Sequence, residues 1–331
     1  MIRRCFILIL AILTMSACAP RIHAPGPAVG KPHLTADAII TADGARLPLR
    51  HWLPATGEPQ AVILALHGFN DYSNFFDDPG QFLAQRYQIA SYAYDQRGFG
   101  EAPNVGHWAG VQAYSDDAKE VISVLKTRHP TVPIYLLGES MGGAVAMVVM
   151  SSGTRPDVNG TILAAPAVWG RVTMPWYQRL ALWVGANTMP WMTLTGRGLN
   201  IKPSDNIEML IDLGRDPLVI KETRIGTIYG LVNLMDAGLK SAPAFKSPAL
   251  ILYGERDEIV PKKPTATMLH TLPEISRDIQ KIALYEGGYH MLLRDIPAST
   301  VWKDIAAWIK APSNPLPSGA DQRSLSIITD G

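Results

Sequence analysis

A serine flanked by glycines stands at the boundary between a predicted strand and a predicted helix. The hexapeptide Gly138–Gly143, GESMGG, follows the apolar run 133–137 and precedes the helix-forming run 144–150. A turn this tight brings neighbouring backbone and Cβ atoms together, so glycine is required on either side of the serine. The string alone is common, but this position is that of a nucleophile elbow, the turn that presents a catalytic serine. Ser140 is therefore a candidate nucleophile, and the chain must contain a strand followed by a helix here.

Short apolar runs alternate with helical patterns along most of the chain. Continuous apolar runs, typical of buried parallel strands, occur at 61–66, 89–94, 133–137, 161–165, 249–253 and 282–285. Helical spacing of apolar residues follows Ser115, which is expected to cap that helix, and a last helix is predicted over 298–309. The pattern predicts the α/β class, with a mostly parallel, eight-stranded sheet flanked by helices.

Two strands are predicted before this alternation begins. Residues 38–41 and 46–52 are expected to pair as a hairpin through the turn at Asp43 and Gly44. Pro48 lacks the N–H that a central strand needs, so it favours an edge position.

Between Trp169 and Pro243 the alternation stops. This segment holds four of the eight tryptophans, 169, 176, 183 and 191, and five of the twelve methionines. We predict a helical cap at 169–243, inserted into a core formed by 33–168 and 244–311. Most of its apolar side chains are expected to pack the cap onto the core. A lipid-facing lid is the alternative for the region as a whole.

The N-terminus is typical of an export signal. Arg3 and Arg4 precede an apolar stretch, 6–13, that is too short to span a bilayer. Residues 15–18, MSAC, resemble a bacterial lipobox, which predicts a signal peptide at 1–17 and lipidation of Cys18. A plain secretory cut near Ala17 or Ala19 is the alternative. Because Ala19 is not an aspartate, we expect a lipid-anchored protein of the bacterial cell envelope, on the outer membrane and facing the periplasm.

Composition describes the two ends and excludes several functions. Residues 18–32 are rich in proline and are expected to form a tether, and 312–331 a flexible tail.

With 47% hydrophobic and 18% charged residues and a net charge of +1, the chain has no signature of a nucleic-acid partner. Both cysteines precede residue 19 and no histidine pair has metal-ligand spacing, so neither a metal nor a cofactor is expected. Nothing in the sequence indicates an oligomeric state.

Four further segments match one fold family in kind and order. They are LALHGF at 64–69, DQRGFG at 95–100, LYGERD at 252–257 and EGGYH at 286–290, with DPLV at 216–219 in the cap. Together with the elbow they resemble the α/β-hydrolase fold and, within it, the monoacylglycerol lipase and lysophospholipase branch (serine aminopeptidase S33-like). The resemblance covers about residues 33–310.

The resemblance implies a catalytic triad of Ser140, Asp257 and His290, in the chain order that this fold uses. His290 would accept the proton of the serine as it attacks an acyl carbonyl, and Asp257 would orient the imidazole. The backbone N–H groups of Phe69 and Met141 would form the oxyanion hole.

Other titratable residues compete for these roles. Asp295 and Glu258 are rivals of Asp257, but neither directly ends a strand. His67 shapes the oxyanion loop in the family pattern, and Asp95 and Arg97 are assigned to the architecture of their turn.

The leading hypothesis is a serine hydrolase that cleaves esters with one long acyl chain, such as monoacylglycerols or lysophospholipids. A short-chain esterase, a depolymerase-like enzyme or a proline iminopeptidase-type peptidase would keep the same triad. Haloalkane dehalogenases and epoxide hydrolases are disfavoured, because they place aspartate where this chain has Ser140. A non-catalytic envelope scaffold is the third hypothesis.

Overall fold

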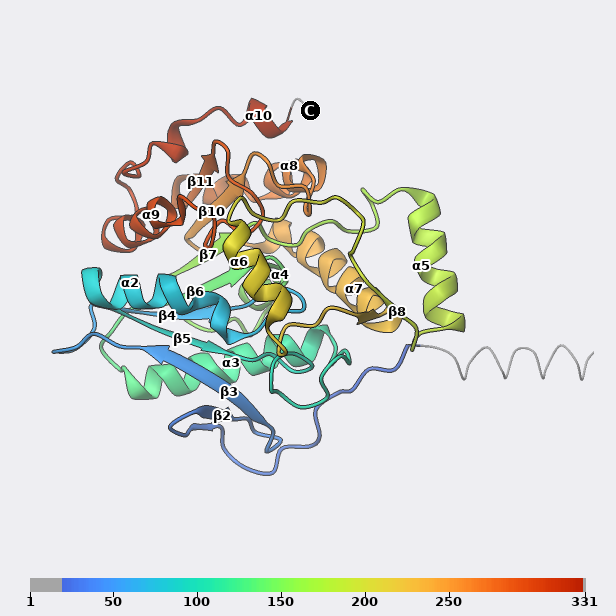
Figure 1. The fold of residues 1–331 in the computed structure, drawn as a ribbon. Helices are drawn as coiled ribbons and strands as arrows, with labels where there is room; N and C mark the ends of the chain where they lie inside the picture. Colours follow the sequence, from blue (N-terminus) through green and yellow to red (C-terminus); the bar gives the residue numbers. More distant parts are fainter. Residues whose placement is uncertain (1–19, 330–331) are drawn as a thin grey trace, which may run out of the picture.

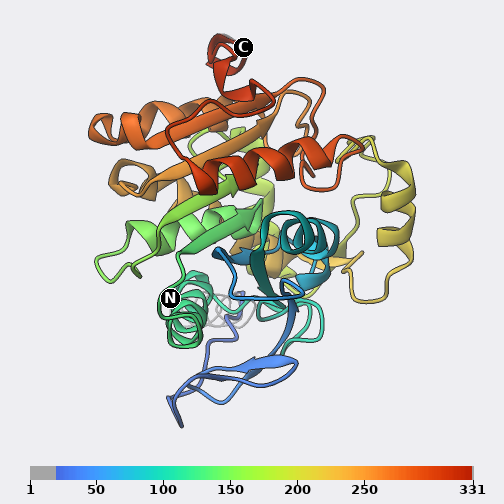
Figure 2. The ribbon, with the colours of Figure 1, turned by 90° about the vertical axis from the view of Figure 1, so that its left-hand side faces the viewer.

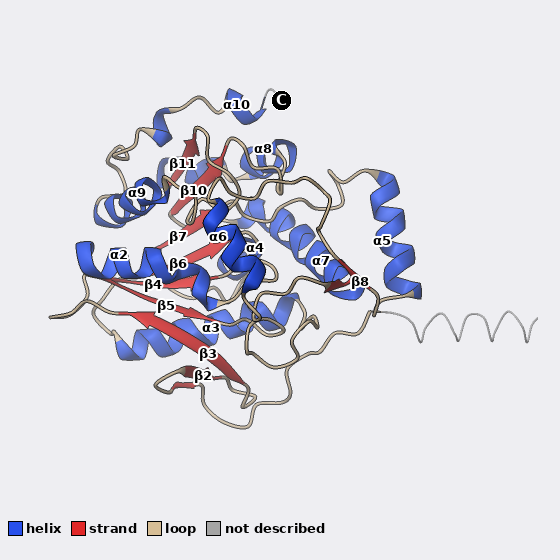
Figure 3. Cartoon of the chain, viewed as in Figure 1, coloured by secondary structure: helices blue, strands red, loops and turns tan. Residues whose placement is uncertain are grey.

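A twisted sheet with helices on both faces forms the body of the protein (Figures 1 and 3). The computed structural model describes residues 20–329, so the predicted signal peptide and Cys18 lie outside the described residues. The sheet order is β1-β2-β3-β5-β4-β6-β7-β10-β11. Its strands are β1 (His33–Leu34), β2 (Ala38–Ile40), β3 (Arg46–Trp52), β4 (Ala61–Leu66), β5 (Ile89–Tyr94), β6 (Ile134–Glu139), β7 (Gly160–Ala164), β10 (Ala249–Gly254) and β11 (Gln280–Tyr285).

The strands from β5 to β11 pair in parallel, whereas β1, β2 and β3 form an antiparallel edge. This edge and the C-terminal segments lie at opposite ends of the sheet (Figure 2). The predicted α/β-hydrolase architecture is confirmed. The sheet has nine strands rather than eight, because His33 and Leu34 pair with Ile40 and Ile39 as a short additional strand.

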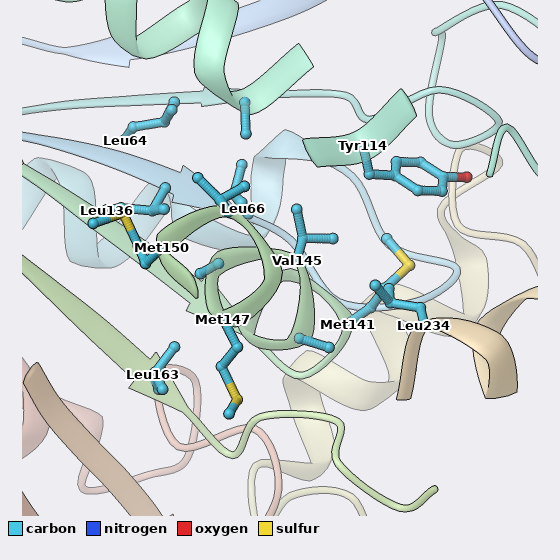
Figure 4. Packing of buried hydrophobic residues seen from close by; sticks show 14 of the residues in the cluster. Leu64, Leu66, Tyr114, Leu136, Met141, Val145, Met147, Met150, Leu163 and Leu234 are labelled. Atoms are coloured by element: carbon cyan, nitrogen blue, oxygen red, sulfur yellow. The ribbon is translucent and has the colours of Figure 1, made fainter. Parts of the chain in front are cut away.

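Two helices cover one face of the sheet, and four cover the other. Apolar residues of α2 (Asp77–Tyr87) and α9 (Ala298–Lys310) pack on the first face. The second face is covered by α3 (Val111–Arg128), α4 (Met141–Ser151), α7 (Ile225–Ser241) and α8 (Lys262–Thr271). Figure 4 shows the buried side chains of α4 between the strands and Leu234 of α7. This packing holds the residue that precedes α4, Ser140, at the end of β6.

Two local predictions are wrong. Pro48 does not mark an edge strand, since β3 lies between β2 and β5. Leu49 is opposite Tyr94, the last residue of β5, so Pro48 falls just beyond that pairing, where a missing N–H costs least. Nor does Ser115 cap a helix: α3 begins at Val111 after Gly110, whose φ of 103° favours glycine, and Ser115 is buried in the helix.

Arg97 is buried at the centre of an ion-pair cluster that joins three segments. Its guanidinium bonds to Asp117 of α3 at 2.7 Å and to Asp43 of the β2–β3 turn at 2.8 Å. A further hydrogen bond of the guanidinium reaches the hydroxyl of Thr41. Arg97 therefore ties the turn after β5 to the hairpin and to α3, which agrees with an architectural role.

We expect Arg97→Met to lower the free energy of unfolding by about 3–5 kcal/mol, because it leaves the buried carboxylate of Asp117 and the partly buried carboxylate of Asp43 without their cation. Denaturant unfolding measures this change. The control is Arg46→Met, which removes an exposed pair with Asp37 and should cost less than about 1 kcal/mol. Unchanged stability combined with lost activity would instead assign Arg97 to the chemistry.

The N-terminal segment lies against the core instead of forming the predicted free tether. The N–H of His23 donates to the carbonyl of Trp108 at 2.8 Å, and Val29 and Gly30 both donate to Ala42. The proline-rich composition suggests a spacer, but the backbone N–H groups of this segment form hydrogen bonds to carbonyl groups of two loops of the core. No helix within residues 20–329 combines the length and hydrophobicity needed to cross a bilayer.

The C-terminal segment, predicted as a flexible tail, also packs on the core up to residue 329. Asp321 pairs with Lys281 of β11 at 2.8 Å, and Arg323 pairs with Glu255 at 2.6 Å. The short helix α10 (Ser326–Thr329) lies beside α8, where Lys262 donates to the carbonyl of Ile327. Ion pairs with residues far away in the sequence hold this segment, and composition alone does not reveal them.

The segment between β7 and β10 contains three helices and one small strand pair. The helices are α5 (Trp176–Thr188), α6 (Ile207–Arg215) and α7, and β8 (Thr193–Leu194) pairs with β9 (Thr223–Arg224). Helix α7 packs on the core, whereas α5 lies at the outside of the molecule (Figure 1) and contacts α7 and the core through residues that include Leu182 and Ala186. Trp176 and Trp183 are 71% and 51% exposed, so the expectation that most apolar cap side chains pack on the core is wrong for α5.

Candidate active site

Ser140 occupies a strained turn between β6 and α4. Its φ of 52° and ψ of −112° lie outside the regions that non-glycine residues favour. Close packing makes its neighbouring glycines necessary: a Cβ added at Gly138 would lie 2.2 Å from the carbonyl oxygen of Gly142. One added at Gly142 would lie 2.1 Å from the carbonyl oxygen of Leu66. The geometry is that of a nucleophile elbow.

His290 and Asp257 form a buried hydrogen-bonded pair beyond the ends of β11 and β10. His290 Nδ1 lies 2.8 Å from Asp257 Oδ2. The other carboxylate oxygen, Oδ1, accepts the N–H groups of Ile259 and Val260 at 2.8 and 2.9 Å. The carboxylate is thus held from both sides, and it orients the imidazole so that Nε2 remains available as a base.

The structure brings the three predicted triad residues to one cavity, because Ser140 and His290 both line it and Asp257 supports His290. Within the described chain, no hydrogen bond of 3.5 Å or less joins the Ser140 hydroxyl to His290. Catalytic hydrogen bonds often shorten only when substrate binds, so this geometry is compatible with a nucleophile and its base.

The predicted oxyanion residues lie on both sides of Ser140. Met141 is the first residue of α4, where an N–H has no partner within the helix. The loop with Phe69 passes close to the serine, since a Cβ added at Gly68 would be 3.5 Å from the Cβ of Ser140. Between residues 20 and 329, neither the Phe69 nor the Met141 N–H donates a hydrogen bond to the protein. Both are free to bind a developing oxyanion.

The rival titratable residues have structural partners. His67 is fully buried; its Nδ1 bonds to the Gly68 carbonyl, and its Nε2 accepts the N–H of Gln96. Burial lowers the pKa of His67, which keeps it neutral in this role. The Asp95 carboxylate accepts the N–H of Glu101 in its own turn and the N–H of Ser73 in the segment before α2.

The two rival acids do not contact His290. Asp295 accepts the N–H of Tyr289 at 2.8 Å and the hydroxyl of Ser204 at 2.6 Å. The exposed Glu258 accepts the N–H of Lys202. Of the three acids compared, Asp257 alone bonds to the histidine.

A buried charge cluster beside the serine was not predicted. Arg294 bonds to Asp71 at 2.7 Å and lies 3.4 Å from Glu139, the residue before Ser140. All three line the cavity, and Glu139 Oε2 and Arg294 Nε have no hydrogen-bond partner among the described residues. Only two weak signals in the sequence point to this cluster. Glu139 is the one charged residue of the elbow hexapeptide, and Arg294 follows His290 by four residues.

The cluster influences the base electrostatically. Burial would lower the pKa of His290, but the Asp257 carboxylate, its hydrogen bond and the charge of Glu139 outweigh burial and raise this pKa above its ordinary value. Arg294 acts in the opposite direction. An imidazole acts as a base only when it is neutral, so with His290 as the predicted base we expect activity to rise with pH through this raised pKa.

We expect Glu139→Gln to move the acidic limb of the pH profile of kcat/KM to lower pH. The substitution removes a negative charge that raises the pKa of His290 and leaves the opposing effect of Arg294 less balanced. The measurement uses a soluble ester over a range of pH. Glu101→Gln, at an exposed acid with no side-chain partner within residues 20–329, is the control. A limb that stays in place or moves to higher pH would contradict this electrostatic role.

The cavity has an apolar wall and a polar end. Its volume is about 380 Å³. The cap supplies much of the wall: Met174 lies before α5, and Ile228, Leu231, Val232 and Met235 lie on α7. The charge cluster lies at the polar end, beside Ser140. Such a site suits a molecule with an apolar chain attached to a polar group.

The cap is hydrogen-bonded directly to the oxyanion loop. The side-chain amide of Asn70 donates to the hydroxyl of Thr223 at 2.6 Å, and the backbone carbonyl of Asn70 accepts the N–H of Ile220 at 2.9 Å. Asp216, from the DPLV segment, accepts the hydroxyl of Tyr72 at 2.7 Å. Asn70 itself has a φ of 65°, so the loop is held in an uncommon conformation at this contact.

The fold and the site geometry together define a class of enzyme, the hydrolases with an α/β-hydrolase fold. In the part of the chain that the structure describes, no group of three histidine, cysteine or acidic residues could hold a metal ion.

The chain belongs to the serine aminopeptidase S33 family, whose model matches residues 57–297. It is similar to the monoglyceride lipase of Mus musculus, with 28% identity over 82% of this chain and 89% of that protein. The monoacylglycerol lipase of Mycolicibacterium smegmatis is 25% identical over 80% of this chain and 93% of its own length. A solved structure of Saccharomyces cerevisiae monoglyceride lipase aligns with a TM-score of 0.68 and 19% identity, covering 86% of this chain and 98% of that one.

Proposed function

We propose that the protein hydrolyses carboxylic esters of lipids with one long acyl chain, such as monoacylglycerols or lysophospholipids. The observation that carries the proposal is the cavity at Ser140, whose lining combines apolar residues of α7 with the buried charges of Asp71, Glu139 and Arg294. The names of the similar lipases agree with this substrate class.

The geometry suits a two-step acyl transfer. Ser140 Oγ attacks the ester carbonyl while His290 takes its proton, and the N–H groups of Phe69 and Met141 stabilise the oxyanion. His290 then donates the proton to the leaving alcohol. Water attacks the acyl-enzyme with His290 again as base, which releases the fatty acid and restores Ser140.

A substrate panel tests the proposal. Nitrophenyl esters of increasing acyl length, monoacylglycerols and lysophospholipids are compared with an amide panel that includes N-terminal proline substrates. We expect a preference for long acyl esters, because each methylene buried in the cavity contributes about 0.8 kcal/mol. A preference for acetate esters would indicate a short-chain esterase, and a preference for proline amides a peptidase; either would overturn the lipid assignment.

Labelling tests the scaffold alternative. A fluorophosphonate probe should modify Ser140, because it reacts with a serine that a neighbouring base activates. Absence of the label at Ser140 would favour a non-catalytic scaffold.

We also propose that the protein is a lipid-anchored component of the bacterial cell envelope, attached through Cys18. The lipobox-like residues 15–18 support this proposal, as does the exposed apolar surface of α5. Ala19 after the cysteine favours the outer membrane. Mass spectrometry of the mature N-terminus is the test, and an unmodified terminus that starts at another residue would refute the attachment.

A further inference from the structure

A second cavity lies where the N-terminal segment meets the cap. Its volume is about 280 Å³, and four basic side chains line it: Arg21, His23, His107 and Arg224. They come from three separate parts of the chain, namely the N-terminal segment, the loop before α3, and β9.

Among the described residues, no acidic side chain pairs with the arginines of this cavity. The lining residues include no aspartate or glutamate, and no carboxylate within residues 20–329 forms an ion pair with Arg21 or Arg224. The acid that is near in sequence, Glu222, accepts a hydrogen bond from Thr193 on β8. Burial and the nearby positive charges of His23 and Arg224 lower the pKa of His107, as expected where cations gather without a counter-charge.

The cavity is built by specific contacts. The His23 N–H donates to Trp108 at 2.8 Å, and the rings of His23 and His107 lie 4.3 Å apart. On the opposite side, the Thr227 hydroxyl donates to the carbonyl of Gly106 at 2.8 Å. These bonds fix the N-terminal segment, the loop and the cap relative to one another, so the backbone positions of the four basic residues surround one cavity, and the exposed Arg21 side chain lies at its rim.

We propose that this cavity binds the phosphate group of an anionic phospholipid. Arginine forms paired hydrogen bonds with phosphate oxygens, and the two imidazoles add donors and, when protonated, charge. The choice of a lipid rests on two neighbouring features. Trp191, which lines the cavity, is 58% exposed, and Leu194 on β8 is 49% exposed. These two side chains offer an apolar surface to an acyl chain.

The second feature is the position of the N-terminal segment. Pro20 lies beside Gly226 at the edge of the cavity, and Cys18 precedes it by two residues, which span at most about 7 Å. The preference for lipid over free phosphate therefore rests on the proposed attachment at Cys18. Binding of a lipid in this cavity does not depend on the hydrolytic reaction proposed for Ser140.

Calorimetry with short-chain lipids tests the site. The full-length chain carries Cys18→Ser, to prevent acylation, and Ser140→Ala, to prevent cleavage of the probe. It is titrated with monomeric dihexanoyl-phosphatidylglycerol, with the phosphatidylcholine analogue, and with inorganic phosphate. We expect the phosphatidylglycerol analogue to bind most tightly, and Arg21→Gln/Arg224→Gln to weaken its binding at least about tenfold, because two charge-assisted hydrogen bonds are lost.

A matched variant controls for net charge. Arg86→Gln/Arg155→Gln removes two exposed arginines that form no ion pair within the described chain, and it should bind the lipid as before. With Ser140 restored, both double variants should hydrolyse a soluble ester at the wild-type rate, so a failure of the hydrolytic proposal would be seen separately.

Three results would overturn the proposal. They are equal binding of the two lipid analogues, unchanged binding after Arg21→Gln/Arg224→Gln, and binding of inorganic phosphate as tight as that of the anionic lipid. The last result would identify a site for free phosphate.

As a local readout, imidazole NMR should show that the anionic lipid raises the pKa of His107, which binding in the Ser140 cavity would not do.

Discussion

Replacement of Ser140 by alanine should reduce kcat for ester hydrolysis by about 10⁴-fold to 10⁶-fold. The elbow places this hydroxyl, rather than any other, at the end of the cavity beside His290. Without it no acyl-enzyme can form, whereas the oxyanion hole and the substrate pocket remain. The measurement is steady-state hydrolysis of a soluble ester, together with fluorophosphonate labelling.

Ser152→Ala is the matched control, because Ser152 lies at the other end of the same helix and its hydroxyl only donates to the carbonyl of Val149. It should leave kcat unchanged. The melting temperature of Ser140→Ala should be close to that of the wild type, since alanine keeps the same Cβ at this φ and, among residues 20–329, the serine hydroxyl forms no hydrogen bond that could be lost. Substantial residual hydrolysis by folded Ser140→Ala would refute the assignment of the nucleophile.

Asp257→Asn should reduce kcat by about 10⁴-fold while the protein stays folded. An asparagine has nearly the same shape, but its amide can present the donor to Nδ1 and thereby favour the wrong tautomer of His290. The loss of the charge also removes the largest attraction that raises the pKa of His290. The pH profile of the residual activity should therefore have its acidic limb at lower pH.

The neighbouring acid provides the control for Asp257. Glu258→Gln changes an exposed carboxylate that bonds only to the N–H of Lys202, so it should have little effect on kcat. Near-normal activity of Asp257→Asn, or a large loss in Glu258→Gln, would show that the acid of the triad was wrongly chosen.

The sequence was sufficient to predict the sheet and the positions of the candidate triad. Parallel strands buried on both faces are continuous apolar runs, and Ser140, Asp257 and His290 each follow one of them. The carboxyl ends of such strands share one edge of the sheet, so residues that are distant in sequence meet there. The apolar runs and the tight turns are local enough to be recognised, whereas the order of the strands in the sheet is not.

Contacts made by long side chains could not be predicted in the same way. Arg294 reaches Asp71 and Glu139 from more than 150 residues away, and no periodicity encodes this meeting. The N-terminal and C-terminal segments were misjudged for a related reason. Their proline, glycine and serine content is typical of linkers, but backbone hydrogen bonds and a few ion pairs hold them on the core.

The bonds between the cap and the oxyanion loop link substrate binding to transition-state stabilisation. Ile220 and Thr223 hold both sides of Asn70, one residue after the predicted oxyanion donor. An acyl chain that orders the cap therefore also helps to fix the position of the Phe69 N–H. By reciprocity, an oxyanion that binds this N–H also stabilises the ordered cap. Loss of cap contacts should consequently lower kcat as well as raise KM, and poor substrates would be rejected at the chemical step rather than only at entry.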